Sequence, residues 1–431
     1  MSRVWSDSLP QFVGDRVGLA GWLHHQRRLA QVTFVLVRDG RGISQVVVDD
    51  AELRAELASW PPETVLRVEG RVVAVPQAPA GVELHDPHFS LLALPDGPLP
   101  FELRRPRLDI QLPTLLDHAA LSWRHPQQRA LGRVAAAAVR GFRSALDERG
   151  FVEIQTPKLV ASATEGGANV FPVDYFERPA FLAQSPQFYK QTMVGVYERV
   201  YETAPVFRAE PHDTARHLAE YLSLDAEMGF ITDHRDVMAL LRDVLETIIG
   251  VVAAVAHESV ERLQLRLPVV PAEIPSINFW DAQALLERET GKPALGEADL
   301  APADERFLGE WAAREFHSEL LFVVGYPMAK RPFYTHPDPQ RPEYSNSFDL
   351  LFRGVELVTG GQRLHRYQDY LQALAGQEIT PYQGYLQAFR YGMPPHGGFA
   401  IGLERLVARL AGVPNVRQVT MFPRDINRLE P

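Results

Sequence analysis

Arginine and carboxylate side chains gather in one segment of this 431-residue chain, Val200 to Glu227, which reads VYETAPVFRAEPHDTARHLAEYLSLDAE. The segment has the pattern of a strand, a polar loop and a second strand. Because side chains alternate along a strand, Arg208 and Glu210 share one face of the first strand. An arginine fork held on a strand is a good bidentate partner for a phosphate. A surface ladder of ion pairs is the alternative that this segment leaves open.

The second strand and the loop add further charged groups to the same surface. Tyr221, Asp225 and Glu227 fall on one face of the second strand, and the loop holds Arg216 and His217. The predicted hairpin therefore presents a guanidinium and several carboxylates together.

A second candidate for phosphate binding lies near the end of the chain, in GMPPHGGFAIGLERLVARL. Glycines precede an amphipathic helix in which Leu403, Leu406, Val407 and Leu410 share one side. Arg405 lies near the start of that helix, where backbone amides and the positive dipole end favour anions. The alternative is a tight turn that carries a solvated arginine.

A third segment, FDLLFRGVELVTGGQRLHR, predicts a strand over Phe348–Val358 that ends in a Gly-Gly turn. Glu356, Thr359 and Arg363 would lie close together there. A carboxylate and a hydroxyl at a strand end can complete the coordination of Mg²⁺ when substrate phosphates supply the other oxygens. A bulged strand with a satisfied threonine is the alternative.

Two shorter segments carry single groups of interest. SATEGGANVF is a loop with Glu165, and QSPQFYKQ begins a helix with Gln187 and Lys190. Such a loop is often a plain surface connection, and such a lysine is usually solvated. Only four of the 44 basic residues are lysines, however, so Lys190 is an uncommon choice for this chain.

These segments need a large scaffold, and the chain predicts two domains. Short β-branched runs separated by turn residues, with a helical insert at Ala51 to Trp60, predict a small barrel of the OB type over residues 1–100. A proline- and arginine-rich stretch predicts a hinge over 101–122. Helical patterns (Arg129–Glu148, Asp236–Ala256) alternate with strand patterns (Arg199–Arg208) beyond it, which predicts one α+β domain over 123–431.

Composition narrows the classes of function. There is no cysteine, which excludes a disulfide framework, an iron–sulfur cluster, a thiolate zinc site and a cysteine nucleophile. A net charge of −10 argues against coating nucleic acid by bulk charge. No apolar stretch is long enough for a bilayer span and no export signal opens the chain, so we expect a cytoplasmic protein without membrane contact.

Taken together, the segments resemble the class II aminoacyl-tRNA synthetases, in particular the aspartyl-tRNA synthetases of the archaeal and eukaryotic-like branch. GFVEIQTPKLV resembles motif 1, whose closing proline lies at the dimer interface of that family. FRAE, RHL and SLDAE resemble motif 2, and GGFAIGLERL resembles motif 3. TEGG, SPQFYK, GVELVTGGQR and the terminal FPRD follow the same order, and the match covers nearly the whole chain.

The resemblance implies an antiparallel catalytic sheet flanked by helices, an N-terminal OB-fold that reads the anticodon, and a homodimer. It implies ATP as a substrate and Mg²⁺ as the cofactor, with Glu356 and Thr359 as metal ligands. Thr359 stands where the family often has serine. The catalytic groups would be Arg208 and Arg405. The implied ATP-binding residues are Arg208, Ala209, Glu210, Arg216, His217, Leu218, Tyr221, Glu356, Gly402, Leu403, Glu404 and Arg405.

The amino acid would be L-aspartate, because cations select a carboxylate over a neutral amide and an unpaired buried charge is costly when the wrong ligand binds. Lys190 and Arg363 are the candidate cations. Asparaginyl-tRNA synthetases typically lack a lysine at the position of Lys190. The full implied aspartate site is Glu165, Ser185, Gln187, Lys190, Arg208, Asp225, Thr359 and Arg363.

The implied RNA partner is tRNA(Asp). Phe34 and Gln45, in a locally basic part of the barrel with Arg27, are candidates to stack on and read anticodon bases; barrel core is the alternative for Phe34. Family members restricted to tRNA(Asp) tend to carry tryptophan and lysine where this chain has His24 and Pro79. We therefore expect the non-discriminating subtype, which also charges tRNA(Asn) for conversion by an amidotransferase.

Three other functions remain open at this level. An asparaginyl-tRNA synthetase would have the same scaffold, although Lys190 argues against it. An asparagine synthetase on this scaffold should lack the N-terminal domain. A non-catalytic RNA-binding paralogue should have lost phosphate ligands, yet Arg208, Glu356 and Arg405 are present.

Overall fold

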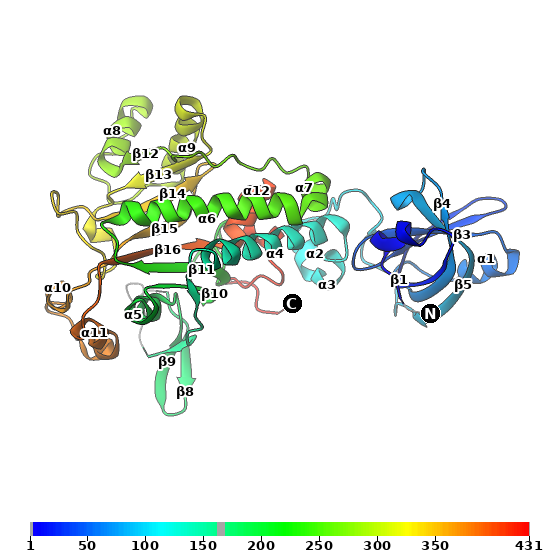
Figure 1. Cartoon of the computed structure of the whole chain (residues 1–431), viewed down its shortest axis with the longest axis horizontal. Helices are drawn as coiled ribbons and strands as arrows, with labels where there is room; N and C mark the ends of the chain where they lie inside the picture. Colours follow the sequence, from blue (N-terminus) through cyan, green and yellow to red (C-terminus); the bar gives the residue numbers. More distant parts are fainter. Residues whose placement is uncertain (1–2, 162–168, 431) are drawn as a thin grey trace. The chain divides into compact units, whose positions relative to one another are not determined.

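The computed structural model describes residues 3–161 and 169–430, and the chain forms two compact units, 1–109 and 110–431. The first unit is a closed five-stranded barrel in the order β1-β2-β3-β5-β4 (Figure 1). Its strands are β1 (Arg16–Arg28), β2 (Thr33–Arg38), β3 (Ile43–Val48), β4 (Val65–Ala74) and β5 (Val82–Ala93), with the helical turns η1 (Ser6–Phe12) and η2 (Pro79–Gly81) and helix α1 (Ala51–Leu57).

Alternation of side chains explains the barrel core. Val35 and Val37 on β2 and Val46 and Val48 on β3 point inward and are almost fully buried. Helix α1 starts where the Asp50 side chain accepts a hydrogen bond from the backbone N–H of Leu53 at 2.8 Å. The predicted OB-type barrel with a helical insert is thereby confirmed.

The second unit is built on an eight-stranded sheet in the order β12-β13-β14-β15-β16-β11-β10-β6. The sheet is antiparallel except at its two edges, where β12 runs parallel to β13 and β6 parallel to β10. The strands are β6 (Val152–Glu153), β10 (Arg199–Phe207), β11 (Glu220–Gly229), β12 (Ser276–Asn278), β13 (Leu320–Val324), β14 (Ser347–Phe352), β15 (Val355–Gln362) and β16 (His396–Gly402).

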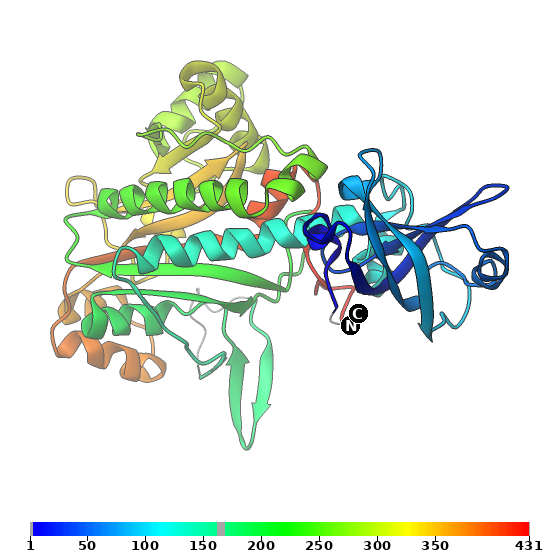
Figure 2. The same ribbon diagram turned by 45° about the vertical axis from the view of Figure 1, so that its right-hand side comes forward.

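Two long helices, α4 (Pro126–Asp147) and α6 (His234–Val255), lie side by side across one face of this sheet (Figures 1 and 2). Their apolar stripes, with Val134, Phe142, Leu241 and Ile248 fully buried, form the main hydrophobic core against the sheet. The opposite face of the central strands is left for polar side chains.

The other elements surround this frame. A hairpin of β8 (Pro172–Tyr175) and β9 (Arg178–Leu182) extends away from the large sheet, with β7 (Leu159–Val160) paired to β9 (Figure 2). The remaining helices are α2 (Leu112–Asp117), α3 (Ala119–Ser122), α5 (Gln187–Tyr197), α7 (His257–Leu263), α8 (Phe279–Thr290), α9 (Pro302–Phe316), η3 (Met328–Lys330), α10 (Tyr367–Ala373), η4 (Thr380–Tyr382), α11 (Gln383–Arg390), α12 (Leu403–Ala411) and η5 (Val416–Val419).

The predicted single strand over Phe348–Val358 is wrong. The chain turns at Arg353 and Gly354, both with positive φ, so that β14 and β15 form a hairpin. Gly360 and Gly361 lie inside β15 rather than in a turn. A Cβ atom on Gly360 would come within 2.4 Å of the Phe348 ring, so close packing, and not a turn, requires glycine there.

Helix α12 follows the predicted pattern, because Leu403, Leu406, Val407 and Leu410 are all buried. Within the described residues, no helix combines the length and apolarity needed to cross a bilayer.

Candidate active site

The polar face of strand β11 forms the floor of the site. Leu224 and Ala226 point into the core beneath α4 and α6, so Ser223, Asp225 and Glu227 point to the opposite side of the sheet. The sequence placed Asp225 and Glu227 on one face, and the strand register agrees.

Two adjoining cavities open over this face, and most of the predicted residues line one or the other. The first, of about 220 Å³, is lined by the predicted ATP residues Arg208, Glu210, Arg216, His217, Leu218, Tyr221, Glu356, Gly402, Glu404 and Arg405, and by Thr359. The second, of about 490 Å³, is lined by the predicted aspartate residues Ser185, Gln187, Lys190, Arg208, Asp225, Thr359 and Arg363. Both include Arg208, Tyr221, Ser223, Thr359 and Ala400.

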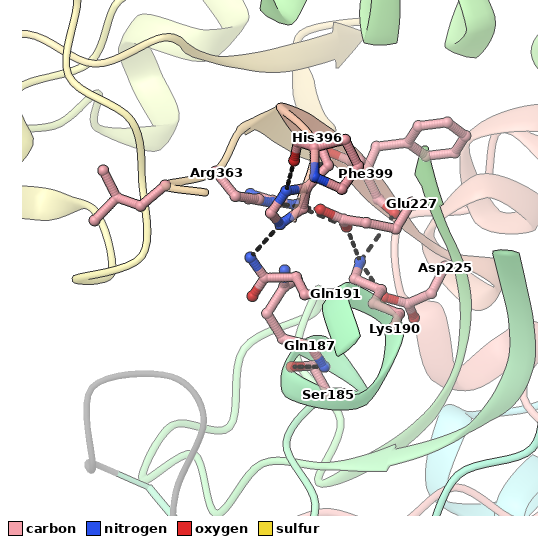
Figure 3. Close-up of polar contacts among 12 residues, drawn as sticks. Ser185, Gln187, Lys190, Gln191, Asp225, Glu227, Arg363, His396 and Phe399 are labelled. Atoms are coloured by element: carbon pink, nitrogen blue, oxygen red, sulfur yellow. Dashed lines mark hydrogen bonds and ion pairs between the residues drawn. The ribbon is translucent and has the colours of Figure 1, made fainter. Parts of the chain in front are cut away.

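Lys190 lines the second cavity, and its side chain reaches Asp225 and Glu227, so it is not a solvated helix-face lysine (Figure 3). Its side chain is only 2% exposed, and Nζ lies 2.9 Å from Asp225 Oδ1 and 3.3 Å from Glu227 Oε2. Helix α5 begins three residues earlier at Gln187, so its first turn carries Lys190 toward the sheet.

Arg363, which follows the end of β15, contacts the Glu227 carboxylate as well. Its Nε donates to Glu227 Oε1 at 2.9 Å, and a terminal nitrogen donates to the Gly398 carbonyl at 3.1 Å. A Cβ atom on Gly398 would lie 2.2 Å from Glu227 Oε2, so only glycine leaves room for that carboxylate. Glu227 therefore links Lys190 and Arg363, the two cations predicted from the sequence to bind the aspartate side chain.

Charge keeps Glu227 ionised. Burial by itself raises its pKa, but the Arg363 guanidinium and the Lys190 ammonium outweigh burial and hold the pKa below its usual value of 4.5. Asp225 receives a second hydrogen bond from the Ser223 hydroxyl. The two cations are thus held by two oriented carboxylates.

A neutral network lies behind this group (Figure 3). Gln191 Nε2 lies 3.0 Å from His396 Nε2, and His396 Nδ1 lies 2.9 Å from the Pro394 carbonyl oxygen. Burial lowers the pKa of His396 to about 4, although Glu227 opposes that effect. A neutral ring that donates from Nδ1 and accepts at Nε2 satisfies both contacts.

At the other end of the site, Glu356 and Thr359 lie close together as predicted from the sequence, but the arginine that contacts Glu356 is Arg405, whereas Arg363 pairs with Glu227. Thr359 Oγ1 donates to Glu356 Oε1 at 3.2 Å, and Arg405 lies 3.5 Å from the same oxygen. Arg405 also donates to the Glu356 main-chain carbonyl at 2.8 Å. Burial raises the pKa of Glu356, but Arg405 and Arg331 outweigh burial and lower it overall.

Asp349 is a further carboxylate at this position. It pairs with Thr359 across β14 and β15, and its Oδ1 accepts from Arg331 at 3.0 Å. Burial, together with the nearby Glu356 charge, raises the pKa of Asp349 to about 6 against the opposing effect of Arg331. In the described part of the chain no three histidine, aspartate or glutamate side chains form a self-sufficient metal cage.

The loop before β11 carries the remaining predicted phosphate ligands. Arg216 pairs with Glu305 of α9 at 3.1 Å, and His217 Nδ1 lies 2.6 Å from the Thr214 hydroxyl. Burial lowers the pKa of His217, and the Arg405 charge lowers it further. Both residues line the first cavity.

Among the described residues, two of the predicted ligands line neither cavity. Ala209 contributes its backbone N–H to the Asn169 carbonyl at 2.8 Å, and Leu403 is buried in the core under α12. Glu165 lies outside the described residues.

The predicted anticodon residues lie on the barrel of the first unit. Phe34 is half-buried and alternates with the core residues Val35 and Val37, so it is not part of the barrel core. It pairs with Arg27 of β1, whose side chain is exposed. Gln45 donates to Glu83 at 2.6 Å. His24 is 8% exposed, and Pro79 begins the turn η2.

Sequence reasoning did not assign a role to Glu227, Asp349, Gln191 or His396. The alternation of β11 could identify the face of Glu227 but not its contact with Arg363. Gln191 follows Lys190 directly, and its link to His396 depends on the antiparallel pairing of β11 with β16.

Comparison with known proteins is consistent with this arrangement. Residues 111–426 match the family model "tRNA synthetases class II (D, K and N)", and residues 17–92 match "OB-fold nucleic acid binding domain". The chain is 46% identical to the aspartate–tRNA(Asp/Asn) ligase of Thermus thermophilus and 44% identical to that of Deinococcus radiodurans, covering 100% of this chain in each case and 100% and 99% of the relatives. The asparaginyl-tRNA synthetase of Pyrococcus horikoshii, solved with asparaginyl-adenylate, superposes with a TM-score of 0.93 at 31% identity over 100% of both chains.

Proposed function

Because the chain belongs to the class II tRNA synthetases (D, K and N), we propose that it is an aspartate–tRNA ligase that forms aspartyl-adenylate from L-aspartate and ATP and then charges tRNA. The observation that carries this proposal is the burial of Lys190 beside Arg363 in the cavity next to the phosphate-binding residues. Two cations at one small cavity favour an amino acid with a carboxylate side chain.

The residues divide the substrates between the two cavities. In the second cavity, Lys190 and Arg363 bind the aspartate side chain, and Asp225 binds the α-ammonium together with Glu165. Ser185 and Gln187 complete this site by hydrogen bonding. In the first cavity, Glu210 binds the adenine amine, Tyr221 stacks on the adenine ring, and Arg216, His217 and Arg405 bind the terminal phosphates.

Arg208 lines both cavities and therefore lies where the two substrates meet. The α-carboxylate of aspartate attacks the α-phosphorus of ATP, the new acyl–phosphate bond forms, and pyrophosphate leaves. Arg208 stabilises the charge that accumulates on the α-phosphate oxygens, and Arg405 holds the leaving pyrophosphate. The 3′-terminal adenosine hydroxyl of tRNA then attacks the adenylate, and orientation supplies much of the acceleration.

The residues around Glu356 fit Mg²⁺. Glu356, Thr359 and the neighbouring Asp349 offer hard oxygen donors, and the Glu356 charge helps to raise the pKa of Asp349, so a bound cation would relieve the repulsion between these carboxylates. Glu356 and Thr359 would hold the ion, with substrate phosphates as its other ligands. When bound, Mg²⁺ would neutralise phosphate charge.

We further propose that the barrel binds the anticodon of tRNA(Asp) and also of tRNA(Asn). This subtype is supported by His24 and Pro79 and by the relatives named for both tRNAs. The aspartyl-tRNA(Asn) would pass to an amidotransferase. A homodimer is supported by the motif 1 segment, since β6 is the edge strand of the sheet and Val152 is 38% exposed there.

Aminoacylation of tRNA(Asp) and tRNA(Asn) transcripts with labelled aspartate tests the proposal. We expect both to be charged. Charging of tRNA(Asn) about 1000-fold less efficiently than tRNA(Asp) would reject the non-discriminating subtype and leave the aspartate ligase in place. Light scattering of the purified protein tests the dimer separately.

Asparagine is the second candidate substrate, because an asparaginyl-tRNA synthetase superposes closely on this chain. Pyrophosphate exchange with each amino acid separates the two. We expect exchange with aspartate, and exchange with asparagine alone would replace the proposal.

A further inference from the structure

The C-terminal segment, residues 415–428, packs against the loop that carries Arg216 and His217. We propose that Arg417 in this segment is a positioning residue, which holds residues 211–217 in the geometry that binds the terminal phosphates of ATP. The inference rests on the proposed function of the first cavity.

Arg417 lines neither cavity, yet each of its three guanidinium nitrogens has a polar partner. Its side chain is 5% exposed. One terminal nitrogen donates to Asp213 Oδ1 at 2.7 Å and the other to the Thr214 carbonyl at 3.0 Å, while Nε pairs with Asp425. One guanidinium thus ties two consecutive loop residues to the end of the chain.

The loop needs such an anchor, because residues 211–215 are all exposed and bury no side chain of their own. An exposed segment without apolar contacts keeps its position only through polar contacts or backbone pairing. Both come from the C-terminal segment. The backbone N–H of Val416 donates to the Ala215 carbonyl at 2.9 Å, and Asn427 donates to Asp213 at 2.9 Å.

The anchor connects directly to a proposed phosphate ligand. Thr214, whose carbonyl accepts from Arg417, contacts His217 through its hydroxyl at 2.6 Å. Arg216, in the same loop, is held by an ion pair with Glu305. Arg417 therefore fixes the base of a loop whose two functional side chains point into the first cavity.

Arg417 is itself held in place, by the turn η5 on which it lies and by its ion pair with Asp425. The backbone amide of Arg417 donates to Asn415, which caps the turn η5, and Val416 is buried in the main core beside α12. Burial raises the pKa of Asp425, but the bonds from Arg417 outweigh burial and lower it overall. The guanidinium is thus held by a charged partner on a buried turn.

Kinetics of aspartate-dependent pyrophosphate exchange with full-length protein test this inference. Arg417→Met removes the fork and keeps much of the apolar volume, and Arg417→Lys keeps the charge without the fork. Arg149→Met is the matched control, because Arg149 also pairs with an acid, Asp243, and a backbone carbonyl of the same unit, away from the loop. Thermal unfolding of each variant is measured in parallel.

We expect Arg417→Met to raise the KM for ATP about fivefold or more, with the KM for aspartate changed less than about twofold. Arg417→Lys should lie between wild type and Arg417→Met, and Arg149→Met should keep both KM values. Equal changes in both KM values, or an unchanged KM for ATP, would overturn the positioning role. Absence of exchange in the wild-type protein would instead reject the proposed function, so the two failures are distinguishable.

Discussion

Lys190 and Arg363 contact opposite oxygens of the Glu227 carboxylate, Lys190 at 3.3 Å and Arg363 at 2.9 Å. The two cations come from different elements, α5 and the end of β15, and one acid fixes both. With Asp225 beside Lys190, the group holds two positive and two negative charges before any substrate enters. An aspartate side chain would then meet cations whose orientation is already set, which lowers the cost of binding.

Replacing Lys190 by methionine should greatly weaken the binding and selection of aspartate. The variant leaves Asp225 and Glu227 with one cation fewer in a buried site, and loss of a partner from a buried ion pair costs about 3–5 kcal/mol. We expect kcat/KM for aspartate to fall about 100-fold or more in pyrophosphate exchange. Lys292→Met, at an exposed lysine, should behave as wild type. Unchanged use of aspartate by Lys190→Met would remove the basis of the proposed function.

The Glu227 charge predicts a specific pH dependence of stability. Its pKa is lower in the folded protein than the usual 4.5, so its contribution to the free energy of unfolding is present above pH 4.5 and is lost as the pH falls below that value. Denaturant unfolding from pH 6 to the lowest pH at which the protein stays soluble measures it.

Glu227→Gln should be less stable at neutral pH and should lose less stability on acidification than wild type. Glu273→Gln, at an exposed glutamate, is the control and should keep the wild-type slope. Parallel slopes for wild type and Glu227→Gln would show that the folded-state pKa is not lowered.

Much of this site could be predicted from the sequence because its ligands lie in short linear patterns. Strand alternation places Asp225 and Glu227 on one face whatever their partners. The contact between Glu227 and Arg363 could not be predicted, since it depends on how β15, β16 and β11 pair and on the space that Gly398 leaves.

Glycine was the least reliable guide to the fold. Gly354 makes the turn between β14 and β15, whereas Gly360 lies in a strand against the Phe348 ring. Gly354 is required for its backbone conformation, and Gly360 is required because a side chain would not fit. The sequence alone does not distinguish these two reasons for a glycine. The burial of Lys190 excludes the alternative that it is a solvated surface lysine. Burial could not be predicted from the sequence, because it depends on how the whole molecule packs.

Glu356 should govern the dependence on magnesium. Glu356→Gln keeps one side-chain oxygen that can accept from Thr359 and Arg405, but it removes the negative charge and one of the two oxygens available to a hard cation. We expect kcat/KM for ATP to fall about 100-fold and the Mg²⁺ concentration for half-maximal exchange to rise. Glu310→Gln on the exposed side of α9 is the control. A normal magnesium titration of Glu356→Gln would exclude this residue as a metal ligand.

Glu404 predicts the opposite pH dependence to Glu227. Burial raises its pKa to about 7, although the Leu222 backbone amide, which donates to it at 3.1 Å, opposes the rise. A carboxyl whose pKa is raised in the folded state favours folding below its usual pKa of 4.5, and this advantage is lost as the pH rises toward 7. Glu404→Gln should flatten the stability profile between these values, as chemical denaturation would measure. A profile that matches wild type would mean that Glu404 is ionised throughout.

Phe34 should matter for tRNA and not for adenylate formation. Its ring is half-buried on the outer side of the barrel, while the neighbouring Val35 fills the core, so truncation removes a stacking surface with little loss of barrel packing. Stacking of a base on an aromatic ring is worth about 1–3 kcal/mol. Phe34→Ala should therefore raise the KM for tRNA(Asp) about tenfold in aminoacylation and leave pyrophosphate exchange at the wild-type rate. Val13→Ala, at a half-exposed residue of the same unit, is the control. An unchanged KM for tRNA would place the anticodon on another surface, and a loss of exchange activity would show that the substitution acts on the fold instead.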